Sequence, residues 1–176
     1  MPVRPKNYPL YTRIRWLIQR DFADVLAIDA ASFATRWEKN DFAAALRKHN
    51  CIGMVSEHGN EIVGMMIYLV LEGELELLRL AVKPSVRRLA VGRQMMEKLI
   101  SKLSHLHRYT IRISVRESNL AGQLFFRSCG LQAVGVNRQA FDDTGEDAYQ
   151  MVYDFANPRL FDGAAPNPIG RSERDC

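Results

Sequence analysis

The sequence predicts an α+β domain in which one mixed sheet of about six to seven strands is flanked by about four helices. Three observations support this fold class. Some segments alternate apolar and polar residues, whereas others repeat apolar residues at helical spacing. Short runs rich in glycine, proline and polar residues separate these segments. The segments follow the order β-α-α-β-β-β-α-β-α-β-β, which fits helices packed around a single sheet.

Length and composition fit one soluble domain. The chain has 176 residues, 47% of them hydrophobic and 25% charged, which is enough for a core and ordinary for a soluble protein. No apolar run reaches the roughly 18 residues that a membrane span needs. Basic residues interrupt the N-terminus where a secretory signal would carry its apolar core. We therefore expect a cytoplasmic protein that does not contact membranes.

The net charge of +4 comes from one short segment. Residues 1–20 contain five lysines and arginines and no acidic residue, so the rest of the chain is close to neutral. Such a segment could touch RNA or an acidic partner, but a solvated terminal segment is the simpler interpretation, and nucleic acid is not the expected partner. The three cysteines (Cys51, Cys129 and Cys176) form no CxxC pair and the histidines show no ligand spacing, so we predict neither disulfides nor a metal site.

The first segments form an arm, a strand and two helices. Residues 1–11 contain three prolines, and we expect a flexible basic arm. Residues 12–16 alternate well enough for a strand. Residues 20–31 and 40–49 place apolar side chains at helical spacing, and Asp21 favours the start of the first helix.

The sequence pattern in the middle of the chain predicts three consecutive strands. Residues 51–56 and 61–70 are apolar runs separated by a Gly-Asn turn signal, which indicates a hairpin. A second turn at Gly73 leads into a strand over residues 75–82. Pro84 ends that strand because proline has no N–H to donate to a sheet.

The last segments alternate between helices and strands. We predict helices over residues 91–106 and 119–129, and strands over residues 110–116, 132–136 and 148–155. Gly130 is placed to end the second of these helices, and a polar turn at residues 142–145 joins the last two strands. Residues 157–176 are rich in proline, glycine and alanine, and we expect a disordered tail. One domain therefore occupies residues 12–156.

Residues 80–93 carry the clearest sequence signal for a binding site. A buried strand leads into a tight turn and then an amphipathic helix, and the small residues Ala90 and Gly92 let backbone N–H groups approach a ligand. The unpaired N–H groups and the positive dipole end of a helix N-terminus together bind anions such as a diphosphate. Such turns also begin ordinary surface helices, but the position between strand and helix favours an anion site. Three arginines add positive charge: Arg87, Arg88 and Arg93.

These residues resemble a known family. The pattern Arg87-x-x-Ala90-x-Gly92 resembles the (Q/R)-x-x-G-x-(G/A) pyrophosphate loop of the GNAT acetyltransferase superfamily, and it follows a strand reading L-A-V-x-P as in that family. Residues 113–131 resemble the family segment V-R-x-S-N-x-x-A…L-Y-x-x-x-G-F. Residues 145–151 are similar to the penultimate stretch of N-terminal protein acetyltransferases. Residues 33–37 resemble the segment after the first helix of ribosomal-protein alanine acetyltransferases. The resemblance spans residues 12–155.

The resemblance implies a GNAT domain that uses acetyl-CoA. In this family a primary amine attacks the thioester directly in a ternary complex, without a covalent enzyme intermediate. A splayed cleft between the strands that end at Val82 and Val115 would hold the pantetheine, and a backbone N–H there would stabilise the oxyanion. The implied cofactor contacts are Leu80, Ala81, Val82, Arg87, Arg88, Leu89, Ala90, Val91, Gly92, Arg93, Asn119 and Phe126. The alternative role of Asn119 is a helix cap, which Ser118 or Asn119 could supply equally well.

The chain departs from the family pattern at three positions. Ala90 replaces the middle glycine of the loop, so we expect a negative φ there. Ser114 stands where the alanine acetyltransferases carry a glutamate base. Phe126 stands where a tyrosine usually protonates the leaving thiolate, and a phenylalanine can offer only a hydrophobic contact to the cofactor arm.

Two other residues are candidates for the missing acid and base. Side-chain alternation along the strand would put Glu76, Leu78 and Leu80 on one face, so Glu76 could point into the cleft as a base. It could equally be a surface carboxylate. Tyr149 could present its hydroxyl to the substrate or leaving group, or it could be a core or interface tyrosine.

We expect the acceptor to be an amine that is partly neutral at pH 7 and therefore depends little on a general base. A protein α-amine has a pKa near ~7.7–8.0, so on the order of a tenth is neutral at pH 7, whereas a lysine near ~10.4 is neutral less than about a thousandth of the time. General-base catalysis is worth ~10²–10⁴-fold. A site without its usual acid and base therefore favours a protein N-terminal α-amine over a lysine.

Two other functions stay open from the sequence. One is acetylation of a small amine, since the acidic residues of the turn could attract a polyamine: Asp142, Asp143, Glu146 and Asp147. The other is a catalytically silent CoA-binding or interaction module. We expect residues 33–42 and 141–145 to form the acceptor groove. The sequence leaves the oligomeric state open.

Overall fold

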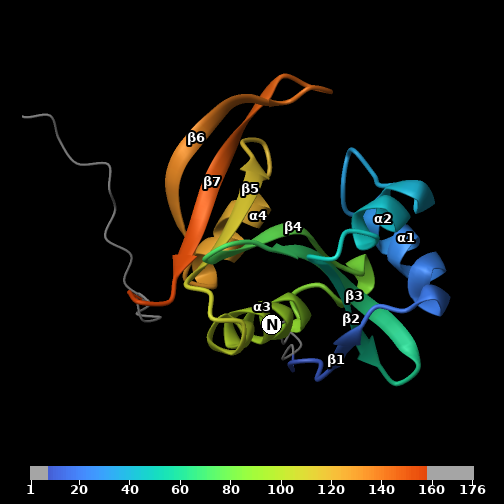
Figure 1. Ribbon diagram of the computed structural model, residues 1–176. Helices are drawn as coiled ribbons and strands as arrows, with labels where there is room; N and C mark the ends of the chain where they lie inside the picture. The colour runs from blue at the N-terminus through green and yellow to red at the C-terminus, as the bar shows by residue number, and fades with distance from the viewer. Residues whose placement is uncertain (1–7, 158–176) are drawn as a thin grey trace, which may run out of the picture.

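The computed structural model describes residues 8–157 and confirms the predicted α+β class (Figure 1). Within these residues, seven strands form one mixed sheet in the order β1-β2-β3-β4-β5-β7-β6, and four α-helices pack on it. Every neighbouring pair is antiparallel except β4 and β5. No helix in this part of the chain is long and apolar enough to span a bilayer. The predicted tail after Asn157 and the first seven residues of the predicted arm lie outside the described residues.

The elements of the N-terminal half follow the predicted order, with ends that shift by a few residues. They are β1 (Arg13–Trp16), the 3₁₀ turn η1 (Gln19–Asp21), α1 (Phe22–Ala30), α2 (Lys39–Leu46), β2 (Cys51–His58), β3 (Glu61–Val70) and β4 (Glu74–Val82). The hairpin turn between β2 and β3 contains Gly59 at φ 61°, a left-handed conformation that glycine adopts readily.

The C-terminal half also matches, except for one strand. It contains η2 (Pro84–Val86), α3 (Val91–His105), β5 (Thr110–Arg116), α4 (Leu120–Ser128), β6 (Gln132–Phe141) and β7 (Glu146–Asp154). The predicted strand over residues 132–136 is too short, because β6 continues to Phe141. As an edge strand, β6 is exposed over most of its length, so its sequence carries no inside–outside alternation that would mark its end.

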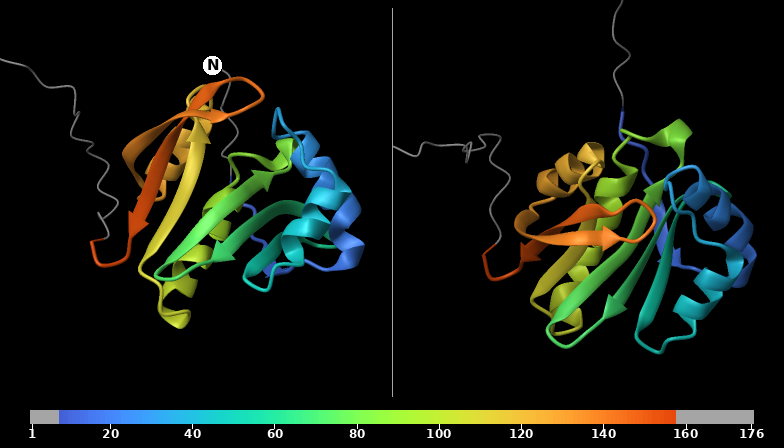
Figure 2. Two further views of the ribbon diagram at one scale, coloured as in Figure 1. Left: turned by 45° about the horizontal axis from the view of Figure 1, so that its top comes forward. Right: turned by 90° about the horizontal axis from the view of Figure 1, so that it is seen from above.

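The sheet has a core on each face, and helices cover both faces (Figure 2). Helices α3 and α4 pack on one face, where Leu77, Met95 and Phe126 belong to the larger core. Helices α1 and α2 pack on the opposite face over β2, β3 and β4, where Val25 and Phe42 are fully buried. On this second face Ser114 of β5 remains exposed, so the β5–β7 half of the sheet is left open there.

The predicted splay between β4 and β5 is confirmed. The two parallel strands pair only from Glu74 with Thr110 to Glu76 with Arg112. Beyond that point β4 stays paired with β3 as far as Val82, and β5 stays paired with β7 as far as Arg116. The two halves of the sheet therefore diverge from a common base, as the left view of Figure 2 shows.

A bulge in β4 changes which side chains face the splay. Arg79 pairs with Ile67 and Leu77 pairs with Tyr68, so Leu78 is the extra residue. As a result Leu78 packs with the α1–α2 core, whereas Leu80 packs with the α3 core. The prediction that Leu80 shares a face with Glu76 and Leu78 is wrong, because simple alternation does not hold across a bulge.

Candidate functional site

The loop between β4 and α3 contains two left-handed residues that are not glycine. Arg88 has φ 62° and Ala90 has φ 65°. The expected negative φ for Ala90 is therefore wrong: the chain turns from strand to helix through a left-handed residue, as a glycine would do at this place. A residue with a Cβ pays roughly 1–2 kcal/mol for this conformation. We call residues 87–93 the cofactor loop.

The cofactor loop presents a row of backbone donors. The first bond of α3 runs from the Gln94 N–H to the Ala90 oxygen at 3.0 Å, and no side chain caps the helix. Among the described residues, no protein acceptor receives the N–H groups of Leu89, Ala90, Val91 or Gly92. These donors lie at the positive end of a 15-residue helix. The arrangement fits a diphosphate.

Gly92 packs closely against a neighbouring aromatic ring. A Cβ at this position would lie 3.1 Å from the ring of Phe125. Phe125 is thus the aromatic residue beside the loop, which the sequence interpretation missed. Phe126 is only 6% exposed and lies in the core, edge-on to Phe125 with ring centroids 5.1 Å apart. A contact between Phe126 and the cofactor stays a prediction.

The arginines of the loop differ in what they contact. The Arg87 guanidinium turns back, donating from Nε to the Val82 oxygen at 3.0 Å and from Nη2 to the Ser32 hydroxyl at 2.9 Å. It therefore ties the loop to the end of β4 and to the residues after α1. Arg88 is exposed. Phosphate contacts from Arg87, Arg88 and Arg93 stay predictions.

Asn119 caps α4. Its Oδ1 accepts the Gly122 N–H at 2.9 Å, and a Cβ on Gly122 would lie 2.6 Å from the Asn119 side chain. The capping interpretation of Asn119 is therefore confirmed. A contact from Asn119 to the cofactor stays a prediction.

The free edge of β4 can bind an extended ligand. The Lys83 N–H donates to the Val63 oxygen at 2.8 Å, and hydrogen-bonding direction alternates along an antiparallel pair. Ala81 therefore points its backbone groups toward β3, whereas Leu80 and Val82 point theirs into the splay. The Val82 oxygen is taken by Arg87, which leaves the Leu80 N–H as a donor at the predicted position.

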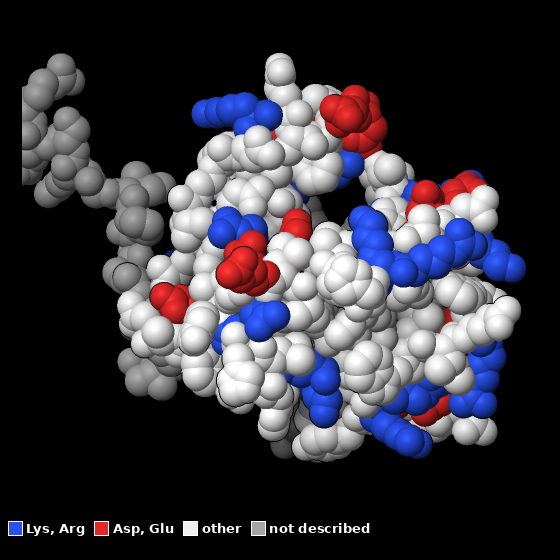
Figure 3. Space-filling view, viewed as in Figure 1, with Lys and Arg blue, Asp and Glu red and all other residues white. Residues whose placement is uncertain are grey.

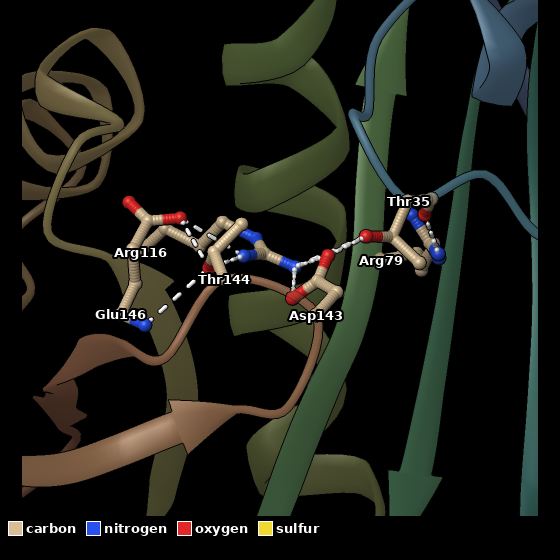
Figure 4. A network of polar contacts seen from close by, with 6 residues as sticks. All are labelled: Thr35, Arg79, Arg116, Asp143, Thr144 and Glu146. Atoms are coloured by element: carbon tan, nitrogen blue, oxygen red, sulfur yellow. Dashed lines mark hydrogen bonds and ion pairs between the residues drawn. The ribbon is translucent and has the colours of Figure 1, made fainter.

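A polar contact joins the two halves of the protein on the open face of the sheet (Figure 4). Thr35, between α1 and α2, donates its hydroxyl to Asp143 in the β6–β7 turn. Arg116 at the end of β5 holds Asp143 at 2.8 Å and Glu146 at 3.0 Å, and its guanidinium lies 3.9 Å from the centre of the Phe141 ring. We call Thr35, Asp143 and Arg116 the clasp. Figure 3 shows the surface hollowed between the β6–β7 hairpin and β4.

Three of the four carboxylates at the β6–β7 turn are paired with other groups. The Thr35 hydroxyl and the Arg116 guanidinium hold the pKa of Asp143 below its ordinary value. Ser118, Thr144 and Arg116 lower the pKa of Glu146 to about 2. The Gln139 N–H and Arg138 likewise lower the pKa of Asp147. All three carboxylates are charged at neutral pH and already have partners.

A buried arginine is hydrogen-bonded to the backbone of Thr35, a residue of the clasp. Arg79 of β4 is 8% exposed, lies 3.3 Å from the Asp29 carboxylate and donates to the Thr35 carbonyl at 2.8 Å. Its guanidinium is 4.2 Å from the centre of the Phe33 ring and 4.8 Å from that of Trp37. Burial lowers the pKa of Arg79 and raises that of Asp29, so the pair compensates only part of the cost of desolvation.

The sequence interpretation missed Arg79. The segment at residues 33–42 was expected to form a wall of the acceptor groove, whereas its aromatic side chains at Phe33 and Trp37 enclose this arginine. The available signal was the position of Arg79, a charged residue within the otherwise apolar second half of β4.

The two candidate catalytic residues lie on opposite faces of the sheet. Glu76 is the last residue of β4 to pair before the splay, and it stands opposite Arg112. Tyr149 stands opposite Val115, whose side chain is in the α3–α4 core. Glu76 therefore stands at the base of the gap, whereas Tyr149 is separated from the gap by β5, and the structure does not bring the two residues together.

Ser114 has a partner that was not anticipated. The Gln150 Nε2 donates to the Ser114 hydroxyl at 2.8 Å. Because the Ser114 oxygen accepts this bond, its own O–H is left to donate elsewhere. A neutral hydrogen-bonding pair thus stands on the open face where the resemblance placed a glutamate base.

Comparison with known proteins agrees with this geometry. Residues 11–131 match the model of the Acetyltransferase (GNAT) family. The chain is 27% identical to the [ribosomal protein bS18]-alanine N-acetyltransferase of Escherichia coli K12 over 127 residues, which cover 71% of this chain and 85% of the relative.

Solved structures show the same fold. The crystal structure of the ribosomal-protein-S18-alanine N-acetyltransferase from Escherichia coli superposes with a TM-score of 0.74 at 24% identity, covering 82% of this chain and 94% of that one. A GNAT family acetyltransferase from Elizabethkingia anophelis with acetyl-CoA bound superposes with a TM-score of 0.66 at 14% identity, covering 81% and 97%.

Proposed function

The chain belongs to the GNAT acetyltransferase family, and on that premise we propose that it acetylates the α-amine of a protein N-terminus in the cytoplasm. As a member of this family it is an N-acetyltransferase that uses acetyl-CoA. The proposal concerns the acceptor and the residues that serve it. The named activity of the Escherichia coli relative supports an N-terminal acceptor.

The observation that carries the proposal is the clasp over the open side of the splay. The Thr35–Asp143 contact joins the α1–α2 loop to the β6–β7 turn, so an acceptor must pass beneath or beside it. An extended chain end suits such a covered groove. A polyamine would instead be drawn to unpaired carboxylates, but three of the four candidates, Asp143, Glu146 and Asp147, are engaged by Arg116 and Arg138.

Backbone groups would hold the acetyl donor and stabilise charge. The N–H groups at the start of α3 bind a diphosphate, and the free edge of β4 pairs with an extended arm. Acetyl-CoA supplies a thioester carbonyl when bound. The Leu80 N–H points into the splay, where it stabilises negative charge as the amine attacks.

Two side chains would move the protons. Glu76 stands at the base of the splay on the face left open for the acceptor, and we assign it the proton of the incoming ammonium. Tyr149 stands on the α3–α4 face, and we assign it proton donation to the leaving thiolate. Because the splay is a gap through the sheet, groups on both faces can reach it.

A thiol-release assay tests the acceptor class. The panel contains a peptide with a free N-terminus and no lysine, the same peptide with an acetylated N-terminus and one internal lysine, and spermidine. We expect turnover with the first and little with the other two. Faster turnover of spermidine or of the lysine peptide would contradict the proposal. Binding of CoA without turnover of any amine would indicate the silent module.

A further inference from the structure

The chain before β1 is bonded to the cofactor loop. The Leu10 N–H donates to the Leu89 oxygen at 2.8 Å. Gln94 of α3 completes the link, because its Nε2 donates to the Leu10 oxygen at 2.7 Å and to the Ala90 oxygen at 3.2 Å. Its Oε1 accepts the Thr12 N–H at 3.1 Å. One amide side chain therefore bonds both the N-terminal segment and the loop.

The far end of this link is anchored in the sheet. The Thr12 hydroxyl lies 3.3 Å from the Gln94 Oε1 and accepts the hydroxyl of Ser56 at 2.6 Å. Ser56 is a fully buried residue of β2. Since β2 is paired on both sides, with β1 and β3, the position of Gln94 is fixed by the sheet and not by α3 alone.

These hydrogen bonds lie in the strained part of the loop. Leu89, whose oxygen Leu10 holds, lies between Arg88 and Ala90, the two residues at positive φ. Non-glycine residues persist in such conformations only where their surroundings over-determine them. Gln94 donates a hydrogen bond to the carbonyl of Ala90, the second strained residue. It also holds Leu10, whose N–H donates to the carbonyl of Leu89.

We propose that Gln94 is a positioning residue for the cofactor: by clamping residues 10–12 onto the loop, it holds the left-handed turn that aims the N–H groups of Leu89–Gly92 at the CoA diphosphate. The inference rests on the proposed placement of the diphosphate at this loop. It gives the segment before β1 a part in cofactor binding.

A purely structural role for Gln94 predicts something different. If Gln94 only stabilised the fold, its loss would lower the unfolding temperature whatever residue occupied position 90. If it holds the left-handed turn, its loss should matter little once position 90 is glycine, because glycine adopts positive φ without the Cβ penalty. The two roles are separated by combining substitutions at positions 90 and 94.

The experiment is a double-mutant cycle in the full-length chain. Gln94→Met, Ala90→Gly and the double variant are compared with wild type, and Ser101→Ala, an exposed position on the same helix, is the matched control. CoA affinity is measured by calorimetry, and thermal unfolding is measured without CoA. A loop that holds its binding conformation about a tenth of the time binds about tenfold more weakly, and this is the expected loss for Gln94→Met. The double variant should bind within about threefold of Ala90→Gly.

A second variant covers the case in which Gln94→Met does not fold. Leu10→Pro removes the donor to Leu89 and leaves Gln94 and the sheet untouched, and we expect weaker CoA binding here too. Unchanged affinity in Gln94→Met or Leu10→Pro, or an equal loss with alanine and glycine at position 90, would overturn the clamp. If wild type binds CoA but Arg88→Glu does not weaken binding, the cofactor placement itself fails, and the clamp with it.

Discussion

Ala90 holds a backbone conformation that its own Cβ opposes. Ala90→Gly removes this opposition, and we expect the free energy of unfolding to rise by about 1 kcal/mol, because the left-handed penalty exceeds the extra entropy that glycine gives the unfolded chain. Urea unfolding measures the change. Ala45→Gly in α2 is the control, since glycine there should destabilise a right-handed helix. A loss of stability in Ala90→Gly would contradict the strained loop.

Tyr68 carries a buried hydroxyl without a hydrogen-bond partner among the described residues. Tyr68→Phe removes a desolvated group that gains nothing in return, so stability should be unchanged or higher by about 1 kcal/mol. The exposed Tyr109→Phe is the control. A loss above about 1 kcal/mol would mean that the hydroxyl has a favourable partner.

The same tyrosine gives a pH dependence. Burial raises the pKa of Tyr68 to about 12, above the ordinary tyrosine value of about 10. The unfolded chain therefore releases this proton first as the pH rises, so the free energy of unfolding falls between about pH 10 and about pH 12. We expect wild type to lose more stability than Tyr68→Phe across this window. Identical pH profiles of unfolding would contradict the assignment.

At the scale of elements, Arg79 joins β4 to the loop between α1 and α2. Arg79→Met leaves the Asp29 carboxylate buried without its cation, and we expect a loss of about 3–5 kcal/mol in unfolding free energy. Adding Asp29→Asn should recover part of this loss, because the uncompensated charge is gone. Arg36→Met, at an exposed arginine of the same loop, should change little. Equal stability of Arg79→Met and wild type would show that the pair is not coupled.

The clasp joins the same loop to the β6–β7 turn. Thr35→Val keeps the side-chain shape but removes the hydroxyl that bonds Asp143, so the cover over the groove loosens. We expect the KM for a peptide acceptor to rise about fivefold, as for a lost hydrogen bond of about 1 kcal/mol, with CoA affinity unchanged. Asp142→Asn on the same turn is the control. A matching loss of CoA affinity would place Thr35 in the cofactor site instead.

At the scale of the whole molecule, the order of elements could be predicted because periodicity and turn residues are local properties of the sequence. The cofactor loop was visible for the same reason, since residues 87–93 lie together between a strand and a helix. The predicted length of the edge strand β6 was too short because an exposed strand shows no alternation of apolar and polar residues.

Other features could not be predicted because they depend on contacts between distant residues. The bulge at Leu78 is a matter of register between β3 and β4, and it moved Leu80 to the other face from Glu76. Arg79 meets Asp29 from 50 positions away in the chain. The left-handed Ala90 and the Leu10–Leu89 bond likewise require the folded arrangement. Sequence periodicity assigns faces within an element but not partners between elements.

The proposed reaction is transfer of an acetyl group from acetyl-CoA to a protein N-terminal amine. The most direct test is mass-spectrometric mapping of the product when the protein, acetyl-CoA and a peptide with both a free N-terminus and an internal lysine are incubated together. We predict a single added acetyl group on the N-terminal residue, lost in Arg88→Glu. An acetyl group found only on the lysine, or an unmodified peptide although the protein binds CoA, would contradict the account.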